Sequence, residues 1–350
     1  MEKDLVRKVF SVIGPRMKKA LALAAALWPL AAPNARTAPS CDAPAALAAP
    51  LDGPLQPLRR VENYHVVLES CHSATRGQKL AVRNMRVDGD AFFLAVDPES
   101  LDTSLESAAC WSCEATSAEA QAGTRFIRAV DRYAAAPGKT LSAGASWLAN
   151  AGLTASPHGE GAFVTGDLCP SLKALDRDFL QKLEKTGSAT PVALSVSGLW
   201  IERHAQDFYW LQREKAEKRL AITFVNHSYH HPYRPGLSDG QNFLLVPDLK
   251  DRESEILDVE RLLIANGETP SVFFRFPGLI SDRAWMERLK TDHLIPLGSD
   301  AWLALPQQAA PGAIVLIHAN GNEPFGLSLF QTLQKANKLP QPFRPINQAP

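Results

Sequence analysis

The sequence lacks an excess of charge of either sign: 37 Lys and Arg residues balance 37 Asp and Glu residues, and the formal net charge is zero. Proteins that bind nucleic acid or anionic membrane surfaces usually carry a basic excess, so we expect neither as a partner. The N-terminal region also lacks a long apolar run. Its apolar stretch 20–27 is too short to cross a bilayer securely, so no membrane span is expected in the mature chain.

The first residues are typical of an export signal instead. Met17-Lys18-Lys19 supplies basic charge, the Ala- and Leu-rich stretch 20–27 follows, and small residues between 32 and 38 suit cleavage. We therefore predict a signal peptide over 1–38, with Met17 as an alternative start, followed by an Ala- and Pro-rich linker over 39–58. The mature protein is expected to be exported, with the periplasm as its compartment.

Cysteine is scarce, with five in 350 residues. In an oxidising compartment we expect these cysteines to form disulfides and not to act as catalytic thiols. Cys110 and Cys113 have the spacing of a redox motif, but no strand-to-helix pattern of the thioredoxin type surrounds them, so a structural bridge between the two is expected. Cys71 and Cys169 complete a set that can form two bridges, leaving Cys41 free or removed with the signal.

The pattern of predicted elements divides the rest of the chain. Residues 59–160 contain two candidate strands, 64–68 and 91–96, and one candidate helix, 117–136, and predict a smaller N-terminal accessory domain. From 161 to 335 strands alternate with helices, which predicts an α/β fold with a parallel sheet, most simply a barrel, before a C-terminal tail over 336–350. The expected strands are 162–165, 191–196, 221–225, 271–274, 294–298 and 313–317, and the expected helices are 175–185, 204–218, 253–266 and 281–290.

Polar side chains follow these strands, where parallel barrels carry their chemistry. Three of the nine histidines fall within residues 227–231. His227 and His231 are four apart, so one helical turn places both imidazoles on one face, where they can occupy two corners of a Zn²⁺ site. A polar loop with hydrogen-bonded histidines is the alternative. The other polar residues at strand ends are Asp167, Ser197, Arg275, Asp300 and His318.

Six segments in order resemble the motifs of the polysaccharide deacetylases, carbohydrate esterases with a distorted (β/α) barrel and a divalent metal. The resemblance covers about residues 161–335. The matching segments are Phe163 to Ser171, Pro191 to Gly198, Asn226-His227-Ser228 with His231, Phe274 to Gly278, Ser299 to Trp302 and Ile314 to His318.

The resemblance implies a metal-dependent hydrolase that removes acetyl groups from an N- or O-acetylated glycan, with Zn²⁺ as the expected ion. It places Asp167, His227 and His231 on the metal and pairs Arg275 with Asp167. His318 would be the general acid, oriented by Asp300. Residues implied in substrate binding are Tyr233, Gly278, Trp302 and Leu316.

Two departures from the family pattern matter. The first motif usually has adjacent aspartates, one the general base and one a metal ligand, whereas here Leu168 follows Asp167. With a single aspartate, Asp167 can be the metal ligand, the general base or only the cap of the following helix, and we expect it to be the metal ligand. Gly278 stands where the family usually has Tyr. A catalytically degenerate carbohydrate-binding barrel, or a hydrolase of another small amide or ester, is the alternative function.

Overall fold

A computed structural model describes residue 41 and residues 52–135, 146–184 and 189–350. These residues belong to one compact unit, Pro39–Pro350. The predicted signal peptide and most of the predicted linker lie outside the described residues. Within the described ranges, no helix is both long enough and apolar enough to cross a membrane.

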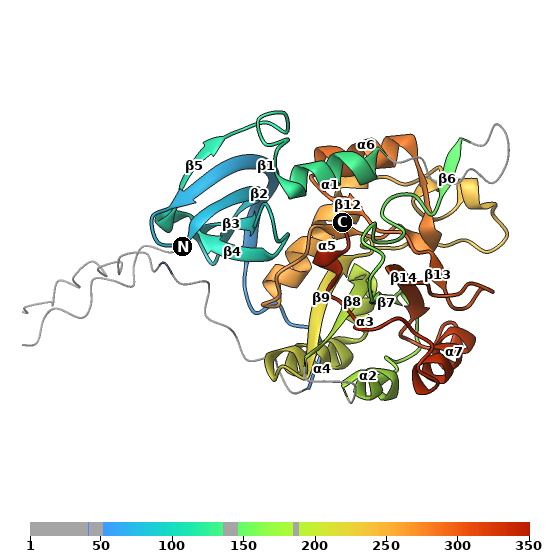
Figure 1. Ribbon diagram of the computed structural model, residues 1–350. Helices are drawn as coiled ribbons and strands as arrows, with labels where there is room; N and C mark the ends of the chain where they lie inside the picture. Colours follow the sequence, from blue (N-terminus) through green and yellow to red (C-terminus); the bar gives the residue numbers. More distant parts are fainter. Residues whose placement is uncertain (1–40, 42–51, 136–145, 185–188) are drawn as a thin grey trace, which may run out of the picture. The chain divides into compact units, whose positions relative to one another are not determined.

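Five antiparallel strands form the first sheet, in the order β4-β3-β2-β1-β5 (Figure 1). Asp88 and Gly89 both have positive φ, as the tight turn between β2 and β3 requires. Two strands were expected here, 64–68 and 91–96, and they lie within β1 and β3. The bounds are β1 Val61–Ser73, β2 Gly77–Val87, β3 Asp90–Val96, β4 Thr103–Ser107 and β5 Ser112–Ala115.

Seven strands form the second sheet, in the order β12-β10-β9-β8-β7-β14-β13. Every ladder in it is parallel. Its outer strands β12 and β13 do not pair with each other in the described part of the chain, so the sheet is a half-barrel. The predicted distorted (β/α) barrel is confirmed. The bounds are β7 Ala162–Leu168, β8 Thr190–Val196, β9 Leu220–Asn226, β10 Phe273–Phe274, β12 Ile295–Pro296, β13 Ala301–Trp302 and β14 Ala313–His318.

Helices connect the parallel strands as the βα pattern predicts. The four helices expected between 161 and 335 are present as α2, α4, α5 and α6, and the helix expected over 117–136 is the shorter α1. A small antiparallel pair, β6 Trp147–Ala149 and β11 Ile280–Asp282, lies beside the second sheet. The helices are α1 Arg125–Ala134, α2 Arg177–Glu184, α3 Gly198–Arg203, α4 Ala205–Ala216, α5 Arg252–Ala265, α6 Arg283–Thr291 and α7 Pro324–Lys335, and the 3₁₀ helices are η1 Ala108–Cys110, η2 Asp239–Gln241, η3 Phe243–Leu245, η4 Pro277–Leu279 and η5 Ile346–Gln348.

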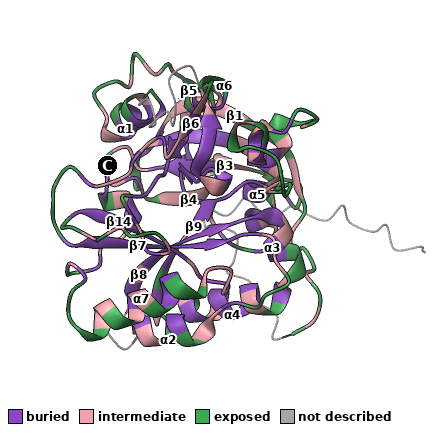
Figure 2. Ribbon diagram, turned by 90° about the vertical axis from the view of Figure 1, so that its right-hand side faces the viewer, coloured by how far each residue is buried: buried purple, intermediate pink, exposed green. Residues whose placement is uncertain are grey.

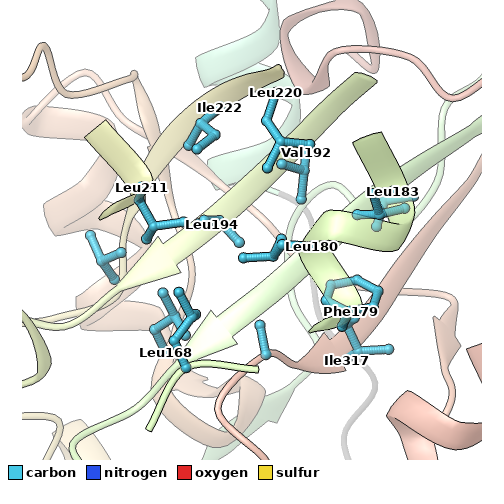
Figure 3. Close-up of a cluster of buried hydrophobic side chains, with 14 of the residues drawn as sticks. Leu168, Phe179, Leu180, Leu183, Val192, Leu194, Leu211, Leu220, Ile222 and Ile317 are labelled. Carbon is cyan, nitrogen blue, oxygen red and sulfur yellow. The ribbon is translucent and has the colours of Figure 1, made fainter. Parts of the chain in front are cut away.

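Both faces of the half-barrel are buried, as its continuously apolar strands require. One face packs against α2, α3, α4, α5 and α7, and Figure 3 shows Leu194 of β8 among Leu180 and Leu211 from the helices. Residues of the opposite face, including Phe163, share a hydrophobic cluster with the first sheet and α1. Figure 2 shows the strands β7, β8 and β9 as buried between these layers. The site therefore rests on a sheet that is held from both sides.

A buried ion pair joins the first sheet to helix α5. Arg83 of β2 donates from Nε to Glu260 Oε2 of α5 at 2.8 Å and from Nη2 to Glu260 Oε1 at 3.1 Å. Tyr64 donates its hydroxyl to Glu260 Oε2 at 2.7 Å, and Arg83 Nη1 donates to the Asp292 carbonyl at 2.8 Å. Both charged side chains are at most 1% exposed. Each charge is therefore compensated inside the protein and not by solvent.

The disulfides differ from the expected pairing. Cys41 bonds Cys110, and Cys71 bonds Cys113. The predicted bridge between Cys110 and Cys113 is wrong, because β1 and β5 pair in a register that places Cys71 directly opposite Cys113. Of the five cysteines, all of which the structure describes, Cys169 alone is free, and it is buried. Two disulfides indicate an oxidising compartment outside the cytosol, while the periplasm stays a prediction.

His293, which follows α6, gives the fold a predicted sensitivity to acid. Burial, and then the nearby charge of Arg83, lower the pKa of His293 to about 4. The unfolded chain takes up this proton near its ordinary pKa of about 6.5, so the stabilisation is present above that pH and is lost as the pH falls toward 4. The free energy of unfolding, measured in urea, is expected to fall less over this range in His293→Asn than in the wild type. Asn tolerates the positive φ of this position.

The exposed His72 provides the matched control, because His72→Asn is expected to leave the acid dependence of the wild type unchanged. Parallel curves for wild type and His293→Asn between pH 7 and 4 would contradict the prediction.

Candidate active site

One cavity of about 460 Å³ opens at the carboxyl ends of the parallel strands. It is the place where the chemistry of a (β/α) barrel is expected. Arg275 is buried directly behind the cavity wall, and Asp300 does not line the cavity. The residues predicted from the sequence that do line it are Asp167, His227, His231, Tyr233, Gly278, Trp302, Leu316 and His318.

Asp167 and Arg275 form a buried ion pair at the end of β7. Arg275 Nη1 donates to Asp167 Oδ1 at 2.9 Å and to Thr165 Oγ1 at 2.7 Å, and Nη2 donates to the Gly298 carbonyl at 3.0 Å. Burial raises the pKa of Asp167, but the charges of Arg275, His227 and His318 outweigh it and leave that pKa below its ordinary value. The pairing implied by the motifs is therefore present, and Asp167 is ionised at neutral pH.

His227 follows β9 and has a defined tautomer. Its Nδ1 lies 2.9 Å from the Arg275 carbonyl, which can only accept, so Nδ1 carries the hydrogen. In the neutral ring, Nε2 then presents its lone pair to the cavity. Nε2 lies 3.5 Å from Cys169 Sγ and 3.7 Å from Asp167 Oδ2. A backbone acceptor on Nδ1 is the usual arrangement for a metal-binding imidazole.

His231 reaches the same place by a loop and not by the expected helical turn. Ser228 and His231 both have positive φ, so residues 227–231 bend tightly and are not helical. The bend is held by Ser228 Oγ, which accepts from the His231 N–H at 3.1 Å and donates to the buried Glu255 at 2.5 Å. The two imidazole centroids are 4.7 Å apart. His231 Nε2 is buried and has no hydrogen-bond partner among the described residues.

A thiol completes this group of donors. The ligand atoms of Cys169, His227 and His231 all lie within 4.8 Å of one another, and Asp167 is not part of that group. Two imidazoles and a thiol are a donor set that suits Zn²⁺, and the unpartnered His231 Nε2 is free to bind it. Cys169 was expected in a disulfide. Its position directly after β7, in the first motif, is the sequence signal that identifies it.

His318 faces Asp167 across the parallel ladder between β14 and β7. Its Nδ1 lies 2.8 Å from Glu323 Oε2, which also accepts from Trp302 Nε1 at 2.8 Å. Burial lowers the pKa of His318, but its neighbours Cys169, Glu323 and Asp167 raise it to about 11. His318 is therefore held close to a carboxylate that keeps its ring in one orientation.

The carboxylate that contacts His318 is Glu323 and not the expected Asp300. Asp300 Oδ1 accepts from the Ile314 N–H at 3.0 Å, so its carboxylate ties the segment before β13 to β14. Glu323 lies in the polar loop that precedes α7, only five positions after His318. The sequence marked residues 320–323 as a polar loop that could shape a pocket, but the family motifs assigned the orienting role to Asp300 and not to Glu323.

The residues implied in substrate binding all line the cavity. Tyr233 is 61% exposed and packs against Phe243, with ring centroids 5.5 Å apart. Gly278 has φ of 60°, and a Cβ there would come within 2.4 Å of the Phe243 ring, so the position requires glycine. Leu316 is buried at the base. The cavity thus combines a polar centre with an aromatic and apolar rim.

No family model matches the sequence. Similar solved structures include a family 4 carbohydrate esterase from Bacillus anthracis, with 18% identity and a TM-score of 0.41 over 57% of this chain and 87% of that chain. A chitin deacetylase from the fungal pathogen Colletotrichum lindemuthianum matches with 18% identity and a TM-score of 0.41, over 57% and 92%. A family 4 pseudoenzyme from Bacillus anthracis matches with 19% identity and a TM-score of 0.36, over 55% and 67%.

The likeness to these structures concerns the fold alone. Their identities lie below 25% and their TM-scores below 0.5.

Proposed function

We propose that this protein is a metal-dependent hydrolase that removes acetyl groups from an N- or O-acetylated glycan, with Zn²⁺ as the ion. One observation carries the proposal. A carboxylate ion-paired with arginine, two imidazoles with converging nitrogens and a third imidazole backed by a carboxylate all face one cavity at the strand ends. This combination suits hydrolysis of an acyl bond better than binding alone.

His227 and His231 would hold the ion. A bound divalent ion polarises a carbonyl oxygen and lowers the pKa of bound water. Asp167 is the base in this arrangement, because Arg275 holds it ionised and its Oδ2 lies on the side of His227. It accepts the proton of the attacking water. His318, oriented by Glu323, donates a proton to the departing amine or alkoxide oxygen.

The rim of the cavity supports a sugar as the substrate. Tyr233 and Trp302 offer aromatic faces on which sugar rings can stack, while Leu316 provides an apolar surface for the acetyl methyl group. In this proposal, backbone N–H groups near Cys169 or Gly278 would stabilise the oxyanion. An acetylated oligosaccharide is accordingly the proposed partner, and no nucleic acid is expected.

Leu168 favours the alternative of a degenerate carbohydrate-binding barrel. It occupies the place of the family's second aspartate and is buried in the hydrophobic cluster that also contains Leu180 and Leu211, on the helix side of the sheet (Figure 3). That position therefore supplies no ligand to the cavity. The alternative predicts glycan binding without turnover, which a direct assay separates from catalysis.

Acetate release is expected from at least one acetylated glycan, and removal of metal with a chelator is expected to abolish it. The panel comprises N-acetylated chitin oligosaccharides, peptidoglycan fragments, O-acetylated xylan and, for comparison, simple acetyl esters and amides. Zn²⁺ added to the stripped protein should restore the rate. Glycan binding without acetate release would support the degenerate barrel, whereas release from simple esters alone would identify a hydrolase of another class.

A further inference from the structure

Cys169 stands on the same side of β7 as Asp167. Residues two apart in an extended chain point to the same face of a sheet, and the residue between them points to the other. Asp167 and Cys169 both line the cavity, while Leu168 lies in the hydrophobic cluster behind it. The local backbone thus delivers two functional side chains to the cavity, a carboxylate and a thiol.

The distance from Cys169 to His227 is that between two ligands of a metal site. In tetrahedral zinc centres, Zn–S bonds of about 2.3 Å and Zn–N bonds of about 2.0 Å place neighbouring sulfur and nitrogen ligands about 3.5 Å apart. Cys169 Sγ lies 3.5 Å from His227 Nε2. The third donor, on His231, lies within 4.8 Å of both. Three ligands and one open position are the usual composition of a catalytic zinc centre.

We propose that the thiolate of Cys169 is the third protein ligand of a divalent metal bound by His227 and His231. The proposal deepens the function proposed above, because it concerns the same metal. It replaces the carboxylate ligand that Leu168 cannot supply, and it leaves Asp167 to act as the base. A soft thiolate selects Zn²⁺ over Mg²⁺ and Mn²⁺, which favour oxygen ligands.

The rival interpretation makes Cys169 a nucleophile activated by His227. Such a pair requires one imidazole beside the thiol. Here a second imidazole converges on the same point, and its Nε2 has no hydrogen-bond partner among the described residues. A nucleophile pair leaves that nitrogen without a role, whereas a metal site uses it. The geometry favours a ligand.

Cobalt replacement tests the proposal in the full-length protein. The other four cysteines are in disulfides, so Cys169 is the thiol that can give a thiolate-to-cobalt charge-transfer band. Protein stripped of metal and loaded with one equivalent of Co²⁺ is expected to show this near-ultraviolet band. Cys169→Ser is expected to lose it, and Asp167→Asn to keep it. Cobalt-loaded wild type without the band would overturn the proposal, whether or not Cys169→Ser folds.

Zinc affinity gives a second readout. Loss of a group that merely supports a ligand costs about 10–100-fold in affinity, so loss of a direct ligand is expected to exceed about 100-fold in Cys169→Ser. Competition with a chromophoric chelator measures it, with circular dichroism and thermal melting as controls for folding. Mn²⁺ in excess should not displace Zn²⁺ from the wild type. Unchanged zinc affinity in a folded Cys169→Ser would refute the assignment.

The outcomes separate this proposal from the proposed function. A thiolate band without acetate release from any glycan would support Cys169 as a metal ligand and contradict the deacetylase function. Acetate release without a thiolate band in the cobalt-loaded protein would support the deacetylase function and contradict the role of Cys169 as a ligand. Activity that survives chelation but is abolished by iodoacetamide would make Cys169 the nucleophile instead.

Discussion

Asp167→Asn is expected to lower the turnover number for deacetylation by about 10²–10⁴-fold, the usual contribution of a general base. The bound metal is expected to stay at the wild-type level, because Asp167 lies outside the group of converging donors. The amide oxygen of Asn can still accept from Arg275, so the site should keep its shape. The turnover number, together with the metal content of the same preparation by elemental analysis, checks both halves of the expectation.

Asp258→Asn is a suitable control, because Asp258 lies on the outer surface of α5 and pairs with Arg261 there. It should change neither quantity. Loss of metal from Asp167→Asn would restore the ligand role that the sequence motifs imply. Full metal with an unchanged rate would leave Asp167 as a structural partner of Arg275.

Arg83→Met is expected to have the largest effect on stability, about 3–5 kcal/mol, the usual cost of removing one partner of a buried ion pair. Glu260 would be left as a buried carboxylate with no opposite charge beside it, and the Asp292 carbonyl would lose the hydrogen bond from Arg83 Nη1. The free energy of unfolding from urea denaturation measures the loss. The double variant Arg83→Met, Glu260→Gln should recover part of it, because no charge then remains unpaired.

Arg60 provides the matched control, because its pair with Glu62 is exposed. Arg60→Met should change the free energy of unfolding by no more than about 1 kcal/mol. Equal losses in the Arg60 and Arg83 variants would show that the buried pair contributes nothing beyond a surface contact.

Local patterns in the sequence predicted much of the fold. Apolar runs alternating with amphipathic helices predicted six of the seven strands of the half-barrel, and the His227 and His231 pair was expected to face one site. Periodicity is a property of neighbouring residues, so a sequence displays it directly. The short strand β13 has only two residues, Ala301 and Trp302, which is too few to show a period.

Which side chains meet in space was harder to predict, because such contacts depend on how strands and loops align in the fold and not on the spacing of residues in the sequence. The bridge from Cys71 to Cys113 follows from the alignment of β1 with β5, which no local pattern encodes. Glu323 meets His318 because the loop before α7 folds back over the cavity. Cys169 lies close to two histidines that are about sixty positions away in the sequence, because β7 and β9 lie on either side of β8 in the sheet.

The shared core beneath the half-barrel bears on how this protein can be divided. Phe163, Val225 and Ile314 of the parallel strands are buried together with Leu80 of β2 and Phe126 of α1. Trimming the chain to residues 161–335 would expose the apolar side chains of the half-barrel that pack against the first sheet and α1. It would also leave the buried Glu260 without its partner Arg83. The N-terminal sheet therefore belongs to the same folded core as the half-barrel, and substitutions in that sheet are expected to disturb the packing beneath the parallel strands.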